Sequence, residues 1–410
     1  MLEMAAHFLW RTTSCAPLPS APPPTSPTTH SAENDDSAAS RVAALPEMWF
    51  LVAEHSGLVG AWRLTGVCRA SREGAKEWLR TLPRLIVCGG HSGRCTSDVW
   101  KLDLEELRWK RMSSLTRERY NHSCCAVRGH LVVLAGQVDD AIDNMYSGVE
   151  ILRNDSDEAE VLPPLSIGPV VNFHALAIDE SESERGQVLL IASDTFIVED
   201  EAASMAIHNV DLTTGVCTPQ PSPISPAAGA TMSASIAHMA DGRIVCVESS
   251  CVRTTNNLDI WQNWYTTAQV FGPPEWGSPS EASWRWKLLP GLSDRSCNGR
   301  GFVLSDGRFA VLGVTHHSTG TYPRECTASF DVLTLDEHSA RWDSLPPLEE
   351  VCELDGVVCE VIGECVLVAG GRLLSKTMKV YEEALGRWRT LPCKLPHDSS
   401  NVFGMCTALM

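Results

Sequence analysis

From residue 84 onward, hydrophobic and polar positions recur in units of about fifty residues. Six short apolar runs begin at residues 84, 130, 187, 243, 308 and 364, at intervals of 46 to 65 residues. Each run is followed by a segment in which apolar and polar residues alternate, such as 97–104 and 328–335. Alternation with a period of two is typical of β-strands, and strand-rich units repeated at this spacing indicate a β-propeller.

The parts of each unit keep a common order. Four units carry a Trp three residues before Leu or Met, at Trp109, Trp286, Trp342 and Trp388. The first unit lacks the strand that should precede residue 84, and the segment 402–410 has the pattern of that missing strand. We therefore predict an all-β fold, a six-bladed propeller over 84–410 whose C-terminal strand completes the first blade and removes open sheet edges.

These units resemble the kelch repeat, which has a glycine pair after an apolar strand and a Trp followed by Leu-Pro. The first and sixth units keep the pair as Gly89-Gly90 and Gly370-Gly371, whereas the fourth has Glu248-Ser249 instead. The resemblance implies a ring that binds partners through the loops at one of its faces.

A short segment before the ring, residues 43–82, is predicted to be helical, with Pro46 in a first turn and a break near Gly57. Its Leu-Pro and Val-Cys-Arg sequences resemble the F-box. That resemblance implies a contact with the adaptor of an SCF-type cullin-RING ubiquitin ligase through Leu45, Pro46, Val52, Leu64, Val67 and Cys68. The alternative is a helical cap that packs on the propeller.

Residues 1–42 are rich in Pro, Ser, Thr and Ala, a composition that buries little apolar surface. We predict a disordered tail there. A transit peptide is the alternative, since Glu3 is the one acidic residue among the first 32.

The net charge of −18 argues against nucleic acid and anionic membrane surfaces as partners, and no stretch of the sequence is apolar for the length of a membrane span. The 16 cysteines lie largely within apolar runs and contain no C-x-x-C spacing, so we expect core thiols and no structural metal. A cytoplasmic or nuclear location follows from this cysteine usage.

The sequence contains no phosphate-binding loop, nucleophile elbow or zincin motif. The pair His316-His317 could supply metal ligands, but the places of the five tyrosines in the repeat do not indicate the convergence that a copper-radical oxidase requires. We therefore predict no catalytic residues, no cofactor and no enzymatic activity. A propeller enzyme remains the third and least favoured function.

Loops on a rigid scaffold commonly carry recognition, and Arg, Tyr and Trp are enriched in binding hot spots. The loops that enter blades two and five, together with an insertion in the fourth unit, supply such residues. The candidate target-binding residues are Arg117, Arg119, Tyr120, Trp261, Trp264, Arg295 and Arg300.

The resemblances together predict a substrate-recognition subunit of the ubiquitin ligase, a monomer within a complex, in which the helices bind the adaptor and the ring binds a target protein. The alternative function is a kelch-repeat scaffold for protein interactions that has no part in ubiquitin transfer.

Overall fold

A computed structural model describes most of the chain in 17 segments. They are residues 38–91, 93–138, 145–153, 156, 158–168, 171–178, 185–193, 205–224, 230–256, 259–273, 284–292, 296–316, 326–336, 339–348, 357–370, 377–396 and 404–408. The chain divides into two units, Met1–Ala44 and Leu45–Met410. Most of the predicted tail lies outside the described residues.

The described part of the first unit contains the helix α2 (Ala38–Ala43), which the sequence analysis placed at the end of a disordered tail. Three of its six residues are alanine, the residue with the highest helix propensity, which accounts for the local helix.

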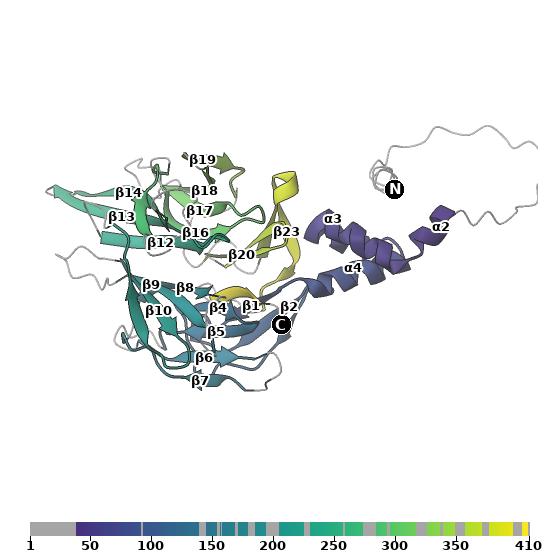
Figure 1. Ribbon diagram of the computed structural model, residues 1–410, viewed down its shortest axis with the longest axis horizontal. Helices are drawn as coiled ribbons and strands as arrows, with labels where there is room; N and C mark the ends of the chain where they lie inside the picture. Colours follow the sequence, from purple (N-terminus) through teal and green to yellow (C-terminus); the bar gives the residue numbers. More distant parts are fainter. Residues whose placement is uncertain are drawn as a thin grey trace, which may run out of the picture. The chain divides into compact units, whose positions relative to one another are not determined.

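The second unit forms six four-stranded antiparallel sheets, and these are the six predicted blades (Figure 1). Blade 1 contains β1 (Arg84–Cys88), β2 (Val99–Asp103), β3 (Arg108–Arg111) and β24 (Gly404–Ala408). Blade 2 contains β4 (Ser123–Val127), β5 (His130–Leu134), β6 (Val149–Leu152) and β7 (Glu160–Leu162). Blade 3 contains β8 (Val171–Ile178), β9 (Gln187–Ser193), β10 (Met205–Asp211) and β11 (Cys217–Gln220).

Blade 4 contains β12 (Ala230–His238), β13 (Ile244–Asn256), β14 (Asp259–Gly272) and β15 (Arg285–Leu288). Blade 5 contains β16 (Ser296–Val303), β17 (Phe309–His316), β18 (Cys326–Leu335) and β19 (Ala340–Leu345). Blade 6 contains β20 (Val357–Ile362), β21 (Cys365–Gly370), β22 (Thr377–Glu382) and β23 (Arg387–Lys394), with a 3-10 turn, η2 (Glu383–Leu385), between the last two. The predicted all-β propeller fold is confirmed.

Blade 1 is closed by strands from opposite ends of the ring sequence. The C-terminal strand β24 pairs with β1 over five residue pairs, from Arg84 opposite Ala408 to Cys88 opposite Gly404. Met405, Cys406 and Ala408 are buried, so the closing strand also contributes apolar side chains to the packing between blades. The predicted closure is therefore present.

Three of the four repeat Trp residues join neighbouring blades through their indole N–H groups, whereas Trp109 Nε1 in blade 1 is buried without such a bond. Trp286 Nε1 donates a hydrogen bond to the carbonyl oxygen of Pro221 at 2.7 Å, and Trp342 Nε1 donates to that of Pro290 at 2.8 Å. Trp388 Nε1 makes the same kind of bond to the carbonyl of Pro346 at 2.8 Å. In each case the acceptor lies just after the outer strand of the preceding blade, which explains why the Trp recurs at that position.

Two helices precede the ring within the same unit: α3 (Pro46–Leu64) and α4 (Arg69–Thr81). Gly57 interrupts α3 with a φ of 67°, as the break predicted from the sequence requires. Apolar residues of both helices, such as Leu58 and Leu79, share one core with Leu102 of β2 and with Ile362 and Leu391 of blade 6. The helices therefore pack on blades 1 and 6.

Among the described residues, no helix is long and apolar enough to cross a membrane. The described cysteines are free thiols, and most of them are buried in the blades. The compartment in which the chain resides stays a prediction.

Candidate interaction surfaces

A buried ion pair holds the loop that enters blade 2. The side chains of Arg119 and Glu150 are fully buried, and Arg119 Nη2 contacts Glu150 Oε1. The second carboxylate oxygen of Glu150 accepts the Thr116 backbone N–H at 2.6 Å. One carboxylate on β6 therefore fixes both the arginine and the backbone of the loop.

Arg119 is bonded on several further sides. Its Nη1 donates to the carbonyl oxygens of Ala135 at 3.2 Å and Gly148 at 3.4 Å. Its backbone oxygen accepts from Gly90 N at 2.8 Å. Burial lowers the pKa of Arg119, while Tyr146 opposes that shift. The prediction of Arg119 as a target-binding residue is corrected, because a fully buried guanidinium offers no surface to a partner.

Gly89 is required by the close approach of this loop to blade 1. Its φ is 60°, and a Cβ on Gly89 would lie 2.5 Å from His122 Cε1 and 2.7 Å from the Arg119 oxygen. A side chain on the first glycine of the pair would therefore clash with the His122 ring and with the Arg119 backbone.

The accessible side of the loop forms a surface that we call the loop patch. It consists of His91, Arg117, Tyr120, Asn121, Gln137 and Tyr146. Arg117 and Asn121 are exposed, and the other four are half-buried.

Contacts within the loop patch order its side chains. The Arg117 Cζ atom lies 5.0 Å from the centroid of the Tyr146 ring, and the rings of His91 and Tyr120 are 5.1 Å apart. Asn121 Nδ2 donates to Gln137 Oε1 at 2.7 Å. The patch thus combines aromatic rings with one exposed arginine on a backbone fixed from beneath.

Two predicted residues, Arg117 and Tyr120, lie in this patch. The sequence analysis did not single out His91, Gln137 or Tyr146 for binding. A usable signal existed for two of them, because His91 follows Gly89-Gly90 and Gln137 follows Ala135-Gly136, the same point in consecutive repeats.

Arg300 occupies a different place from the one predicted. It lies on β16, an innermost strand of the ring, rather than in the loop that enters blade 5 (Figure 1). Its Nε donates to the Val357 carbonyl at 2.8 Å, and its Nη1 lies 3.5 Å from Nδ1 of His174 on β8. Burial and the charge of Arg300 lower the pKa of His174 to about 3.

Arg300 therefore connects blades 5, 6 and 3 at the centre of the ring. Its predicted place in an entering loop is corrected, and its contacts are those of a group that holds the inner strands together.

For the remaining predicted target-binding residues, the structure describes either the backbone alone or nothing. Arg295 lies outside the described residues. Trp261 and Trp264 lie on the long strand β14, which pairs with β13 as far as Asn256 opposite Asp259, so the predicted polar loop is an extended β-hairpin. Their side chains lie outside the described part of the structure.

The predicted adaptor-binding residues differ in their exposure. Leu45 is 48% exposed and Val67 53% exposed, and Cys68 is also exposed. Pro46 and Val52 are half-buried. Leu64 is 2% exposed and belongs to the core shared with the ring, so its predicted contact with an adaptor is corrected.

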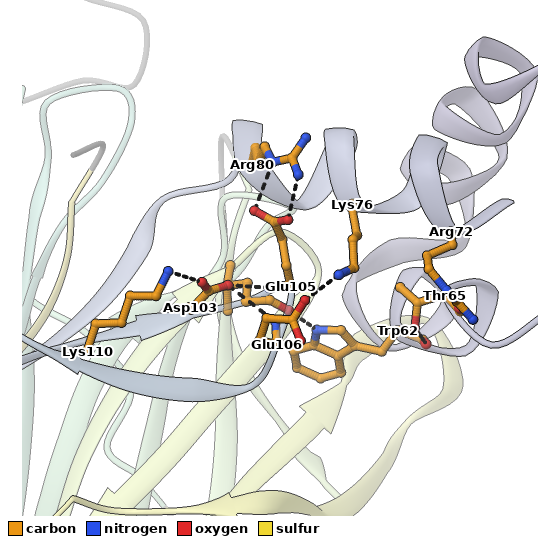
Figure 2. A network of polar contacts seen from close by, with 10 residues as sticks. Trp62, Thr65, Arg72, Lys76, Arg80, Asp103, Glu105, Glu106 and Lys110 are labelled. Atoms are coloured by element: carbon orange, nitrogen blue, oxygen red, sulfur yellow. Dashed lines mark hydrogen bonds and ion pairs between the residues drawn. The ribbon is translucent and has the colours of Figure 1, made fainter. Parts of the chain in front are cut away.

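Polar contacts fix α4 to the turn between β2 and β3 (Figure 2). Arg80 donates two hydrogen bonds to the carboxylate of Glu105, at 2.9 and 2.8 Å, and Lys76 pairs with Glu106. Trp62 Nε1 of α3 donates to the Leu104 carbonyl at 2.7 Å. The helices are therefore held to blade 1 by side chains as well as by the shared core.

Within the described segments, no group of three or more His, Cys, Asp or Glu side chains is arranged to hold a metal ion. His316 is the last residue of β17, and His317 lies outside the described residues.

A model of the kelch motif matches residues 83–116, which span most of blade 1. This match and the six-bladed ring support a kelch-repeat propeller. None of the curated proteins matches the sequence.

Among solved structures, the chain is similar to one described as YjhT, with a TM-score of 0.51 and 10% identity over 75% of this chain and 97% of that one. It is also similar to an α-L-arabinanase of Penicillium chrysogenum complexed with arabinobiose, with a TM-score of 0.47 and 12% identity over 69% of this chain and 83% of that one. These likenesses concern the fold.

The prediction that the chain is not an enzyme is corrected. The kelch match and the six-bladed ring define a fold, and a fold of this kind does not by itself exclude catalysis. We withdraw the exclusion of enzymatic activity.

Proposed function

We propose that this protein is a kelch-repeat interaction scaffold that binds a partner protein at the loop patch. The observation that carries the proposal is the buried Arg119–Glu150 ion pair beneath the patch. It fixes the loop backbone, so Arg117 and Tyr120 lose little further conformational freedom when a partner binds.

The composition of the loop patch also favours binding. Tyr provides a large contact area with few rotatable bonds to fix, and both Tyr and Arg are enriched where truncation weakens a protein interface most. Asn121 and Gln137 add hydrogen-bonding groups at the edge of the aromatic rings.

The test is affinity purification of the full chain from cells, followed by quantitative mass spectrometry. We expect a set of proteins that is retained by the wild type and lost from the double variant Arg117→Ala, Tyr120→Ala. Arg341→Ala is the matched control, because Arg341 is exposed on the outer strand of blade 5. If the double variant retains the same proteins as the control, the loop patch is not the binding site.

A second candidate function is the recognition subunit of a cullin-RING ubiquitin ligase, with the helices as the adaptor-binding surface. One observation favours it: Leu45, Leu51 and Val67 are 48%, 49% and 53% exposed, although other apolar residues of these helices pack on the ring. Exposed apolar side chains on a docked element suit a second protein surface.

Co-expression with the ligase adaptor tests this candidate. We expect the wild type to retain the adaptor and Val67→Asp to reduce retention at least tenfold. Leu385→Asp is the control, because Leu385 is an exposed apolar residue on blade 6, at 54%. A wild type that retains no adaptor excludes the ligase function and leaves the scaffold function standing.

A further inference from the structure

Three thiols lie together where blade 1 meets blade 2. Cys88 ends β1, Cys124 lies on β4, and Cys406 lies on the closing strand β24. Their exposures are 0%, 8% and 4%. They share one core with Ile86 and Val133, so the cluster joins two blades rather than lying inside one.

The sulfur atoms are held close to the closing strand. Cys88 Sγ lies 3.4 Å from His122 Nε2 and 3.7 Å from the Gly404 carbonyl oxygen. A Cβ on Gly404 would lie 2.9 Å from Cys124 Sγ, so the glycine leaves the room that the sulfur occupies. Side-chain hydrogen bonds connect Cys124 with both Cys88 and Cys406.

The three thiols are not equivalent. The hydrogen bond from Cys124 is the main cause of a lowered pKa at Cys88, whereas the bonds to Cys406 and Cys88 raise the pKa of Cys124. His122 Nε2 accepts the Gly404 backbone N–H at 3.1 Å, so the nitrogen nearest the sulfur already has a partner. Cys88 Sγ donates to the Gly404 carbonyl oxygen, so both thiols carry their protons in the resting structure, and the lowered pKa makes Cys88 the one that loses its proton more easily.

We propose that Cys88 and Cys124 form a reversible disulfide that clamps blade 1 to blade 2. A peroxide is the class of oxidant that suits the site, because hydrogen peroxide is little larger than water and both thiols are buried. Cys88 loses its thiol proton, and its sulfur attacks one peroxide oxygen, which breaks the O–O bond. The proton and the leaving hydroxide combine as one water, and Cys88 becomes a sulfenic acid.

The Cys124 thiol then attacks the Cys88 sulfur. The S–O bond breaks, the S–S bond forms, and the Cys124 proton leaves with the hydroxyl as a second water. In sum, two thiols and one hydrogen peroxide give one disulfide and two waters. A dithiol reductant reverses the step by thiol–disulfide exchange.

The disulfide would lie directly under the loop patch. Cys88 is three residues before His91, and Cys124 is four residues after Tyr120. A covalent bond between β1 and β4 would fix the spacing of the two loops that carry these rings. This consequence, unlike the disulfide itself, rests on the proposed binding function of the patch.

Peptide mapping of the full chain tests the disulfide. Trypsin releases Cys88 in 85–94 and Cys124, with Cys125, in 120–128. After hydrogen peroxide treatment of the folded protein and alkylation in denaturant, we expect most of peptide 85–94 to be linked to 120–128. The link should vanish after dithiothreitol treatment and in Cys124→Ser.

Cys125→Ser is the matched control, because Cys125 is adjacent in sequence but packs in the core between blades 2 and 3. It should keep the link. Exposed Cys68, in peptide 64–69, reports whether the peroxide has acted. The proposal is overturned if Cys68 is oxidised while peptide 85–94 stays free, or if 85–94 is linked to the Cys406 peptide 395–410.

The clamp is tested by comparing how much partner protein the oxidised and the reduced chain retain in the affinity purification. We expect at least a threefold difference for the wild type and none for Cys124→Ser. Equal retention by oxidised and reduced wild type overturns the clamp. If the loop patch binds nothing, the peptide map still decides whether the disulfide forms.

Discussion

Two arginines separated by one residue have different environments in the loop that enters blade 2. Arg119 is enclosed with Glu150, whereas Arg117 lies exposed over the Tyr146 ring. Removing one partner of a buried ion pair leaves the other charge without compensation in a region of low dielectric constant.

We expect Arg119→Ala to lower the free energy of unfolding by about 3–5 kcal/mol, because Glu150 is left buried and unpaired. Arg117→Ala should change it by less than about 0.5 kcal/mol, since exposed substitutions have small effects. Urea unfolding of both variants measures the difference. Equal losses of stability would mean that the ion pair does not support the loop.

Glu360 on β20 gives the fold a dependence on pH. Burial raises its pKa to about 8, and Thr407 Oγ1 lies 3.3 Å from its carboxyl oxygen. The folded state therefore keeps the proton over a range in which the unfolded chain, with an ordinary value of 4.5, has lost it. Stability from this group is present below pH 4.5 and is lost as the pH rises through about 8.

Glu360→Gln should therefore flatten the decline of the unfolding free energy between pH 4.5 and pH 8, and the variant should be more stable than the wild type at pH 8. Urea unfolding at a series of pH values measures both effects. Glu364→Gln, at an exposed turn, is the control. Parallel profiles of wild type and Glu360→Gln would show that Glu360 does not carry the dependence.

The sequence indicated which kinds of residue could serve at an interface, but it did not predict which of them lie on the surface. Arg117 and Tyr120 were predicted for a surface and lie on one, but Arg119 and Leu64 are enclosed by partners from other elements. Arg119 meets Glu150 from the following hairpin, 31 positions away, and Leu64 meets the ring. Burial of this kind depends on long-range packing, which a local sequence pattern does not contain.

At the scale of elements, the sequence left two interpretations of the docked helices open: an F-box-like contact with an adaptor, and a helical cap on the propeller. Their shared core with blades 1 and 6 explains why so short a segment holds its shape. The exposed ion pairs Lys76–Glu106 and Arg80–Glu105 fix the orientation of α4 on blade 1 more than they stabilise the fold, because solvent screens them.

We expect Leu79→Ala to lower the free energy of unfolding by about 2–5 kcal/mol through the cavity that it leaves, and to shift a single cooperative transition. Lys76→Ala and Arg80→Ala should each cost about 0–1 kcal/mol. Circular dichroism in the helical and β regions during urea unfolding measures this. Separate transitions for the two signals would show that the helices are not part of the ring's cooperative unit.

Strand positions were predictable because their signals are local. Alternation, the glycine pair and the Trp each describe a few neighbouring residues. Alternation recurs in all six units, the Trp in four of them, and the intact glycine pair in the first and sixth. The hairpin of β13 and β14 was taken for a loop, because Thr254-Thr255-Asn256 and its neighbours read as polar turn residues while their pairing depends on the facing strand.

At the scale of the whole molecule, we expect the closing strand to stabilise the ring. A chain that ends at residue 401 lacks β24, leaves the edge of β1 unpaired, and removes Met405, Cys406 and Ala408 from the packing between blades. We expect its melting temperature to fall by several degrees.

Differential scanning calorimetry measures that shift. A chain with Thr407→Ser, which keeps every strand pair, is the control for small changes in β24. If the shortened chain melts at the wild-type temperature, closure by β24 does not stabilise the ring.

Closure of the ring by its last strand also has a consequence for biosynthesis. Helices α3 and α4 leave the ribosome before any blade does, yet the core that covers them includes Leu391 and Met405. Until the last blade and β24 have been made, the apolar side of these helices has only the part of its native cover that blade 1 supplies. We therefore expect the nascent chain to depend on chaperones that shield its N-terminal helices for almost the entire time of translation.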